Sequence, residues 1–387
     1  MKNIRHAALI VLSASLLLAS GCGVKSNPVN QTLQPTQTLP ASAEVTEQQV
    51  EPASLSFEGS SLYFLTQQEG WAGGKGLLLH TNNGGQQWEV RYQGEYEFIS
   101  LLFVDAKTGW ALGVGDHDRA LLHTVDGGKH WEVLAHPNKE LTDIRFVNDA
   151  LGYGGPLVTQ DGGKTWQPVS APPQLIGNPY FSNASNGYAV TGDGSQFRIM
   201  RTTDGGKTWA KVYEHRTDAL TGARLQGANS EDVWVLLYGN SGMTQTSYTL
   251  LHSADAGAHW TPVLVHSTAG GGPAPGGEDL NSAGKGPGSR PDQLVVADSQ
   301  TAFMMGVCPA CGEGTVTFGG TADGGKTWSD SSGQWPAQGA KLFFTDAKHG
   351  YMLTYSLQKT SRLFTTADGG KTWVAAGYPN VYFPVQF

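Results

Sequence analysis

The order of apolar and polar positions divides the chain into three unlike stretches. Residues 7–18 are apolar apart from two serines, and residues 23 to about 50 are rich in Pro, Thr, Gln and Ser without a helical or strand period. From about residue 54, aromatic positions recur at a fixed spacing. A polar stretch without periodicity is typical of a disordered spacer, whereas the recurring aromatic positions predict short strands between turns. We therefore expect a spacer over residues 22–52 and a folded domain over residues 53–387.

One aromatic residue, usually preceded by glycine, starts a strand in each recurring unit. It lies at Trp71, Trp110, Tyr153, Tyr188, Trp234, Phe303 and Tyr351. Seven places earlier, six of the seven units carry an apolar residue: Phe64, Phe103, Phe146, Phe181, Val296 and Phe344. The fifth unit departs from this pattern, with Gly227 at that place and Leu225 nearby.

A second motif, typified by Thr-Gln-Asp-Gly-Gly-Lys-Thr-Trp at residues 159–166, closes every unit. Its tryptophans are Trp88, Trp131, Trp166, Trp209, Trp260, Trp328 and Trp373. Five places before each lies an acidic or amide residue: Asn83, Asp126, Asp161, Asp204, Asp255, Asp323 and Asp368. A side-chain oxygen here can accept backbone N–H groups inside a turn, and glycine supplies the positive φ. We therefore assign these Asp turns to structure rather than catalysis.

The resulting unit reads strand, tight turn, strand, variable loop, strand, Asp turn, strand, and it occurs seven times. Such units cannot bury both faces alone, but stacked radially they hide their sheet edges. The sequence therefore predicts an all-β, seven-bladed β-propeller with four-stranded antiparallel blades and Asp-box turns. Ser54 to Phe57 or Val381 to Val385 could add an outer strand to a terminal blade.

The Asp turns resemble the Asp-box, or bacterial neuraminidase repeat (BNR), of sialidases, xyloglucanases, sortilin-like receptors and photosystem II stability/assembly factors. The resemblance covers residues 54 to about 376, and seven consecutive copies at this spacing are most similar to the assembly-factor type. That resemblance implies a non-enzymatic binding protein. The assembly-factor family presents a basic patch to its membrane-protein client, whereas this chain has few arginines, so a photosystem partner is not carried over.

The first residues predict a signal peptide and a lipid attachment site. Lys2 and Arg5 precede the apolar stretch, and Ala19-Ser20-Gly21-Cys22 follows it. This arrangement resembles a bacterial lipoprotein signal over residues 1–21, with Cys22 lipidated after cleavage. An ordinary cleaved signal with an incidental cysteine is the alternative. We expect the protein on the extracytoplasmic side of the cell membrane, held there by its lipid anchor.

Composition narrows the partners. With 25 basic against 33 acidic residues the formal charge is −8, which argues against a nucleic-acid partner. The 52 glycines and 19 prolines do not fit a long helical bundle or a multi-span membrane protein. We expect a monomer without cofactor or metal that binds an unknown protein or an envelope glycan.

Strand direction places the Asp turns on one face and the loops between second and third strands on the other, which we call the variable face. We call the aromatic residue that starts the second strand the landmark aromatic. From it to the tryptophan of the Asp turn the separation is 17, 21, 13, 21, 26, 25 and 22 residues in the seven repeats. The loops on the variable face therefore differ in length, which favours binding there. We expect the partner to contact the central mouth and variable loops. The candidate residues are Asp116, His117, Asp118, Arg119, His215, Arg216 and Tyr238. A metal or catalytic site at residues 116–119 is the sharper alternative to a solvated loop tip.

Two further segments leave alternatives open. Cys308 and Cys311 could form a disulfide in an oxidising compartment, remain free thiols, or serve metal or redox exchange. The Gly/Pro-rich insertion over about residues 266–291 is either a mobile connector or a lid over the variable face.

Glycoside hydrolysis is the competing function. Phe197-Arg198-Ile199-Met200 is similar to a sialidase Phe-Arg-Ile-Pro motif, but it lacks the proline and directly precedes an Asp turn. Xyloglucanases place their cleft between two propellers, and one is expected here. The sequence therefore favours a binding or scaffold protein over a hydrolase.

Overall fold

The computed structural model describes residues 57–277, 284–311, 314–331, 333–357, 360–377 and 381–382. The expected signal peptide, the spacer and Cys22 lie outside these residues. The secondary structure within them is entirely β. Over the same ranges, no helix has the length and apolar character that crossing a membrane requires.

The strands form antiparallel sheets in which neighbours along the chain pair with each other. The first sheet contains β1 (Gly59–Phe64), β2 (Gly70–Thr81), β3 (Trp88–Phe103), β4 (Gly109–Val114), β5 (Arg119–Thr124) and β6 (Glu132–Ala135). The second contains β7 (Arg145–Phe146), β8 (Gly152–Gly154), β9 (Leu157–Thr159) and β10 (Gln167–Pro168), and the third β11 (Leu175–Phe181), β12 (Gly187–Gly192), β13 (Gln196–Thr202) and β14 (Ala210–Arg216).

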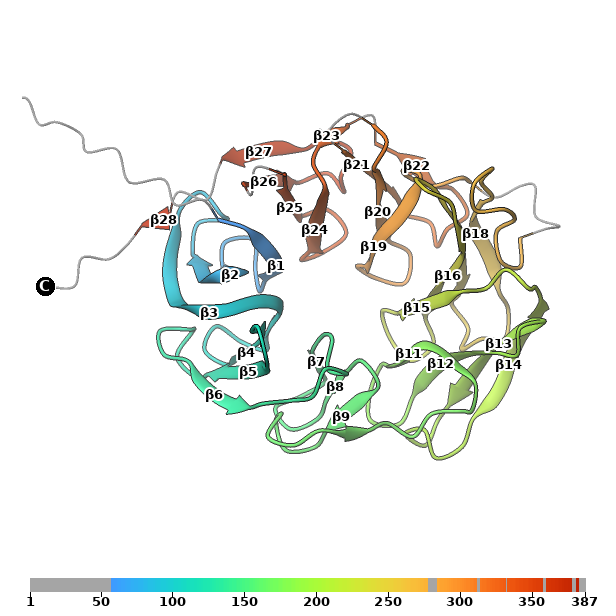
Figure 1. Cartoon of the computed structure of the whole chain (residues 1–387), viewed down its shortest axis with the longest axis horizontal. Coiled ribbons are helices and arrows are strands. Elements are labelled where there is room, and N and C mark those ends of the chain that lie inside the picture. The colour runs from blue at the N-terminus through green and yellow to red at the C-terminus, as the bar shows by residue number, and fades with distance from the viewer. Residues whose placement is uncertain are drawn as a thin grey trace, which may run out of the picture. The chain divides into compact units, whose positions relative to one another are not determined.

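The remaining sheets follow the same order. The fourth contains β15 (Gly222–Gln226), β16 (Val233–Ser241), β17 (Thr246–Ser253) and β18 (Thr261–His266). The fifth contains β19 (Arg290–Val296), β20 (Ala302–Cys308), β21 (Thr315–Thr321) and β22 (Ser329–Asp330), with β23 (Trp335–Pro336) also paired to β21. The sixth contains β24 (Gly339–Phe344), β25 (Gly350–Tyr355), β26 (Ser361–Thr366) and β27 (Val374–Gly377). Figure 1 shows these sheets arranged as a ring, with β1, β7, β11, β15, β19 and β24 nearest its centre.

The prediction of an all-β propeller is confirmed, but the expected number of seven blades is wrong, because the described strands form six sheets. The first two sequence repeats share one sheet. Strand β3 pairs with β2 through Glu89–Gln93 and with β4 through Phe98–Phe103, and Glu97 pairs with a residue of each. The outer strand of the first repeat thus continues without a loop as the inner strand of the second.

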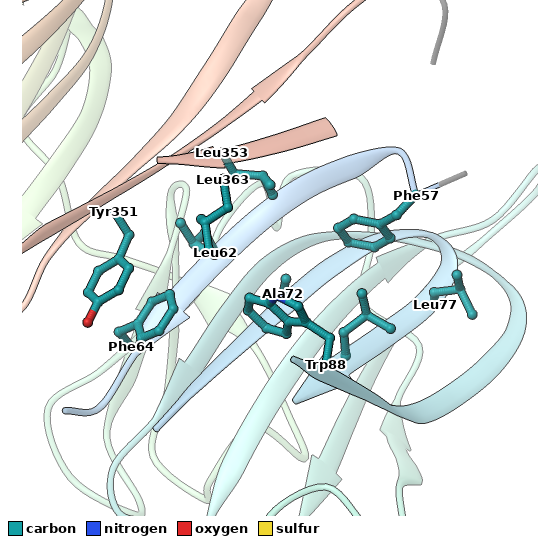
Figure 2. Packing of buried hydrophobic residues seen from close by; sticks show 10 residues of the cluster. Phe57, Leu62, Phe64, Ala72, Leu77, Trp88, Tyr351, Leu353 and Leu363 are labelled. Atoms are coloured by element: carbon teal, nitrogen blue, oxygen red, sulfur yellow. The ribbon is translucent and has the colours of Figure 1, made fainter. Parts of the chain in front are cut away.

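Aromatic stacking joins successive repeats. The aromatic residue that starts the second strand of one repeat stacks on the phenylalanine that ends the first strand of the next. Ring centroids lie 3.6 Å apart for Trp71–Phe103, 4.1 Å for Trp110–Phe146, 4.8 Å for Tyr153–Phe181, 3.8 Å for Phe303–Phe344 and 3.5 Å for Tyr351–Phe64. The last pair closes the ring. Figure 2 shows Tyr351 beside Phe64, with Leu353 and Leu363 packed near Leu62 in the same buried cluster.

Each Asp turn is an internal hydrogen-bond network. In the third repeat, Thr159 Oγ1 accepts the Gly163 N–H at 2.9 Å and donates to Asp161 Oδ1 at 2.8 Å. Asp161 in turn accepts the backbone N–H of Thr165 at 2.9 Å and its hydroxyl at 2.6 Å. These bonds from Thr165 lower the pKa of Asp161 to about 2. In the first repeat, Asn83 Oδ1 accepts the Gln87 N–H at 2.9 Å, so an amide preserves the turn.

A second turn element was not predicted from the sequence. The residue five places before each landmark aromatic accepts backbone N–H groups in the first turn; these residues are Thr66, Asp105, Asn148, Asn183, Asn229, Asp298 and Asp346. The first turn then accepts an N–H from the Asp turn of the same repeat, as in Gly162 N to Ala150 O at 2.9 Å. This pairing makes the Asp-turn face a uniform scaffold.

A terminal segment completes the first sheet. Strand β28 (Val381–Tyr382) pairs in parallel with Trp88 and Glu89 of β3. Phe57 is buried in the ring-closing cluster but lies outside any strand. Of the two expected outer segments, the C-terminal one therefore supplies the strand; residues 54–56 and 383–385 lie outside the described ranges.

Candidate binding site

A cavity of about 800 Å³ lies among the inner strands of repeats three to seven. Side chains alternate along a strand, so the residues that face the centre lie one and three places before Phe146, Phe181, Gly227 and Val296, at the end of each first strand. The cavity is lined by such pairs: Asp143 and Arg145, Asn178 and Tyr180, Arg224 and Gln226, and Gln293 and Val295. Its size is in the range of about 300–1,000 Å³ found for ligand pockets.

The third repeat opens one side of this cavity. Its four strands, β7 to β10, are each two or three residues long, and Gly155–Pro156 alone join β8 to β9. At Gly154 a Cβ atom would lie 2.2 Å from the Asp143 carbonyl oxygen, so glycine permits the close approach of the two chain segments. Because this β8–β9 connection belongs to the variable face and its glycines line the cavity, the cavity reaches that face beside the short sheet.

Arg145 is the most unusual group in the cavity. Its Nη2 is buried without a hydrogen-bond partner among the described residues, and its guanidinium lies 4.6 Å from the centroid of the Tyr180 ring. The Tyr180 hydroxyl donates to Gly227 O at 2.6 Å, which fixes the ring, and burial raises its pKa. An unpartnered buried donor is costly unless a ligand satisfies it. The arrangement is therefore suited to an anionic or carbonyl oxygen.

A second group of charges lies where the inner strands begin, at the variable-face end. Burial raises the pKa of Asp292, and the positive charges of Lys341 and Arg224 oppose that shift. Burial also raises the pKa of Tyr238, which lines the cavity beside Arg224. Arg224 is exposed and makes no hydrogen bond or ion pair with the described residues. Arg224 and Tyr238 thus line the cavity, and Asp292 lies within electrostatic range of Arg224 and Lys341.

The predicted loop at residues 116–119 is largely occupied with its own structure. Asp118 Oδ2 lies 3.1 Å from His136 Nδ1 and accepts the Tyr96 hydroxyl at 3.3 Å, while Arg119 donates to Leu141 O. Asp116 and His117 are exposed. Within the described ranges, no three His, Cys, Asp or Glu side chains are grouped as metal ligands. The contacts of Asp118 and Arg119 hold the loop in place, while Asp116 and His117 stay exposed on it.

The other predicted residues lie in different places. His215 and Arg216 end the outer strand β14, away from the mouth, and the His215 ring lies 6.2 Å from that of Phe197. Tyr238 lies at the mouth, as described above. The structure thus does not bring His215 and Arg216 together with Tyr238.

The described parts of the insertion pack against the fourth sheet. Ala274 is fully buried, and Ser247 Oγ donates to Gly271 O at 3.1 Å. Lys285 O accepts the Tyr248 hydroxyl at 2.8 Å and His266 Nδ1–H at 2.7 Å. Residues 267–277 and 284–289 thus contact the fourth sheet, and the choice between a connector and a lid stays a prediction. Cys308 and Cys311 are joined as a disulfide at the end of β20.

The central mouth was expected from the sequence, but most of the residues that line the cavity were not. Arg145, Tyr180 and Gln293 are among them, although Arg145 and Tyr180 directly precede Phe146 and Phe181. The spacing of the motifs gives the number of strands, and the alternation of side chains along each inner strand also tells which of them face the centre. This alternation is the signal in the sequence that could have identified the cavity residues.

Comparisons with known proteins agree with this architecture. A family model described as Photosynthesis system II assembly factor YCF48 matches residues 90–187. A comparison with curated proteins found no match. Among solved structures, a Mycobacterium tuberculosis puromycin-hydrolyzing peptidase is 12% identical, with a TM-score of 0.54 over 86% of this chain and 55% of the peptidase.

Two other solved structures are similar to this chain at low sequence identity. A structure from a study of two prolyl endopeptidases is 12% identical with a TM-score of 0.50, over 83% of this chain and 49% of its own. The Niastella koreensis GH74 enzyme is 13% identical with a TM-score of 0.37, over 83% of this chain and 66% of the enzyme. The chain spans about half the length of the two peptidase structures, so these likenesses concern the fold alone.

Proposed function

Because the family match and the fold fit a BNR-repeat propeller of the photosystem II assembly factor-like kind, we propose that this chain is a non-catalytic binding protein. Its partner is a protein with an acidic segment, held at the variable-face mouth of the central cavity. The observation that carries the proposal is the unpartnered, buried Nη2 of Arg145 in a cavity that Arg224 also lines. Both guanidiniums can bind carboxylate oxygens in pairs.

The surroundings of these arginines support an extended ligand. Tyr180 and Tyr238 offer aromatic surface beside the charges, and Gln293 is fixed by two hydrogen bonds with the backbone of Leu342, at 2.8 and 2.9 Å. A rigid wall with a few oriented polar groups lowers the entropy cost of binding. Assembly-factor-like binding by a membrane-tethered protein needs no reaction at this site.

The test uses two cavity variants and a matched surface variant. Arg145→Gln and Arg224→Gln are each expected to weaken capture of a membrane protein from detergent-solubilised membranes by about tenfold to a hundredfold, because a hydrogen bond to a charged group contributes about 1.5–3 kcal/mol. Arg216→Gln, on the outer strand β14, is the control and should bind like the wild type. Equal binding by all three variants would contradict the proposal.

Hydrolysis is tested on the same preparations. The purified wild type is expected to leave sialosides, β-glucans and peptide substrates intact. Turnover that disappears when Asp143 is replaced by Asn would instead assign the cavity to an enzyme, since this carboxylate lines it.

The proposed location has its own test. If the lipid on Cys22 tethers the protein, Cys22→Ser is expected to move it from the membrane fraction to the soluble fraction. A variant that stays membrane-bound after a high-salt wash would show that another anchor exists.

A further inference from the structure

A second hollow, of about 360 Å³, lies on the Asp-turn face between the last sheet and the first. We call it the seam hollow. Its lining includes four amide side chains from the first sheet, Gln67, Gln68, Asn83 and Gln86, and His349, Asp368 and Val374 from the last. It lies on the face opposite the central mouth and is no part of the proposed partner site.

The walls of the seam hollow are held rigidly. The Tyr351 hydroxyl donates to Gln67 O at 2.7 Å, and the Tyr351 ring stacks on Phe64 with centroids 3.5 Å apart. Figure 2 shows this stack at the edge of the buried cluster that closes the ring. A ligand in the hollow would therefore meet preformed walls, which favours binding.

The charged groups of the seam hollow are already paired within their own turns. Asp368 accepts the backbone N–H of Thr372 at 2.9 Å and its hydroxyl at 2.6 Å. His349 Nδ1 lies 2.9 Å from Asp346 Oδ2. These groups therefore offer little to an ionic ligand.

The free hydrogen-bonding capacity of the hollow lies in its glutamines. Asn83 is used in its turn with Gln87, but the side chains of Gln67, Gln68 and Gln86 are exposed and make no hydrogen bond with the described residues. The Asp turn of the first repeat also differs in charge from the other Asp turns. Gln86 stands where five other turns carry lysine (Lys129, Lys164, Lys207, Lys326, Lys371), and Asn83 stands where six carry aspartate.

We propose that the seam hollow binds a neutral saccharide. An amide presents a donor and an acceptor together, as a sugar hydroxyl does, so three amides can satisfy neighbouring hydroxyls without charge. Val374, whose exposed fraction is 66%, offers apolar surface to the C–H face of a sugar ring. The volume, at the lower end of the range for ligand pockets, suits a disaccharide.

The test is a titration of the purified propeller with cellobiose, chitobiose and maltose, followed by ligand-observed NMR and calorimetry. At least one of these sugars should bind, whereas a glucuronate-containing disaccharide should bind at least tenfold more weakly. Gln86→Lys is expected to abolish binding, because it restores a bulky charge that the same turn accommodates in five other repeats. Gln67→Ala should weaken binding at least tenfold without changing the melting temperature.

Two controls make the result specific. Lys164→Gln in the Asp turn of the third repeat makes the converse change and should leave sugar binding as in the wild type. Arg145→Gln, in the central cavity, should also leave it unchanged, which separates this site from the proposed function. The proposal is overturned if none of the three sugars binds, if binding survives Gln86→Lys, or if glycyl-glycinamide binds the hollow as tightly as the sugars.

Discussion

The fifth repeat is joined to its neighbours differently from the rest of the ring. At five joints an aromatic pair stacks across the boundary, but no such pair exists on either side of the fifth repeat, where Gly227 and Val296 replace phenylalanine. On the entering side, the Tyr188 hydroxyl donates to Ser230 O at 2.9 Å. A directional polar contact thus takes the place of a stacked surface.

On the leaving side a histidine replaces the indole donor. In the first two repeats, Trp71 Nε1–H and Trp110 Nε1–H donate to the first glycine carbonyl of the next Asp turn, at 3.3 and 3.0 Å. In the fifth repeat, Trp234 Nε1 has no partner among the described residues. His252 stacks on that indole at 3.8 Å and donates from Nδ1 to Gly324 O at 2.9 Å.

The replacement depends on a buried carboxylate. Asp232 is 1% exposed, and its Oδ2 lies 2.8 Å from His252 Nε2, while its Oδ1 accepts the Ala228 N–H at 3.0 Å. The corresponding histidine of the second repeat, His123, lies 3.8 Å from the exposed Glu132. The same contact between repeats can therefore be made by different chemistry, provided that the donor ends at the same carbonyl.

The largest expected effect comes from removing the buried carboxylate. Asp232→Ala leaves His252 Nε2 and the Ala228 N–H without partners, and should lower the free energy of unfolding in urea by about 3–5 kcal/mol. Glu132→Ala, which removes the exposed carboxylate near His123, is the control and should change the free energy of unfolding by less than about 1 kcal/mol. Equal effects of the two variants would show that the fifth repeat is not special.

An aromatic joint should be less costly to weaken. Phe344→Leu keeps an apolar side chain but removes the stack on Phe303, so we expect a loss of about 0.5–1.5 kcal/mol beyond the change in buried area. Equilibrium unfolding measures it. A loss as large as that of Asp232→Ala would mean that the aromatic joints, rather than the buried contact between Asp232 and His252, dominate ring stability.

The entering joint of the fifth repeat can be tested with a single atom. Tyr188→Phe removes the hydroxyl that reaches Ser230 O and should cost about 0.5–1.5 kcal/mol, because a neutral hydrogen bond is lost. Tyr351→Phe makes the same change where the ring is also stacked on Phe64. If the two variants differ, the difference measures how much the stack compensates for the lost bond.

The smallest expected effect is a loss of stability at low pH. Hydrogen bonds from the residue before each tryptophan lower the pKa of Asp126, Asp161, Asp204, Asp255, Asp323 and Asp368 to about 2, below the ordinary value of 3.8. Their contribution to stability is present above about pH 4 and is lost as the pH falls toward 2. The melting temperature should fall in this window, and less so in Asp161→Asn, which gives the third turn the amide that the first repeat carries. An unchanged pH profile in that variant would contradict the assignment.

Much of the scaffold could be predicted from the sequence, because each turn and stack uses residues at fixed spacing. The continuous β3 could not be, since the landmarks count repeats and do not show whether a loop separates them; Gly94 is the one turn residue between Trp88 and Phe98. The contacts of the insertion could not be predicted for a related reason. Its glycines suggest a chain without a packed element, yet backbone groups such as Gly271 O receive hydrogen bonds from the fourth sheet.

The candidate sites, unlike the scaffold, could not be predicted from local sequence patterns. Arg145 and Arg224 come from inner strands of different repeats, and only the closed ring brings them to one cavity. No local pattern marks an arginine as unpartnered. The seam hollow likewise depends on Gln67 and Val374 meeting across the ring closure.

The continuous strand β3 has a consequence for where the chain can be cut. Between the third and fourth repeats, residues 169–174 form a mostly exposed connection, where new termini could be introduced without dividing a strand. A cut within residues 93–97 would divide the strand on which both of the first two repeats depend. A circular permutant opened at 169–174 should therefore fold, whereas one opened in β3 should not. The smallest piece that can be duplicated or exchanged at this end of the ring is a pair of repeats.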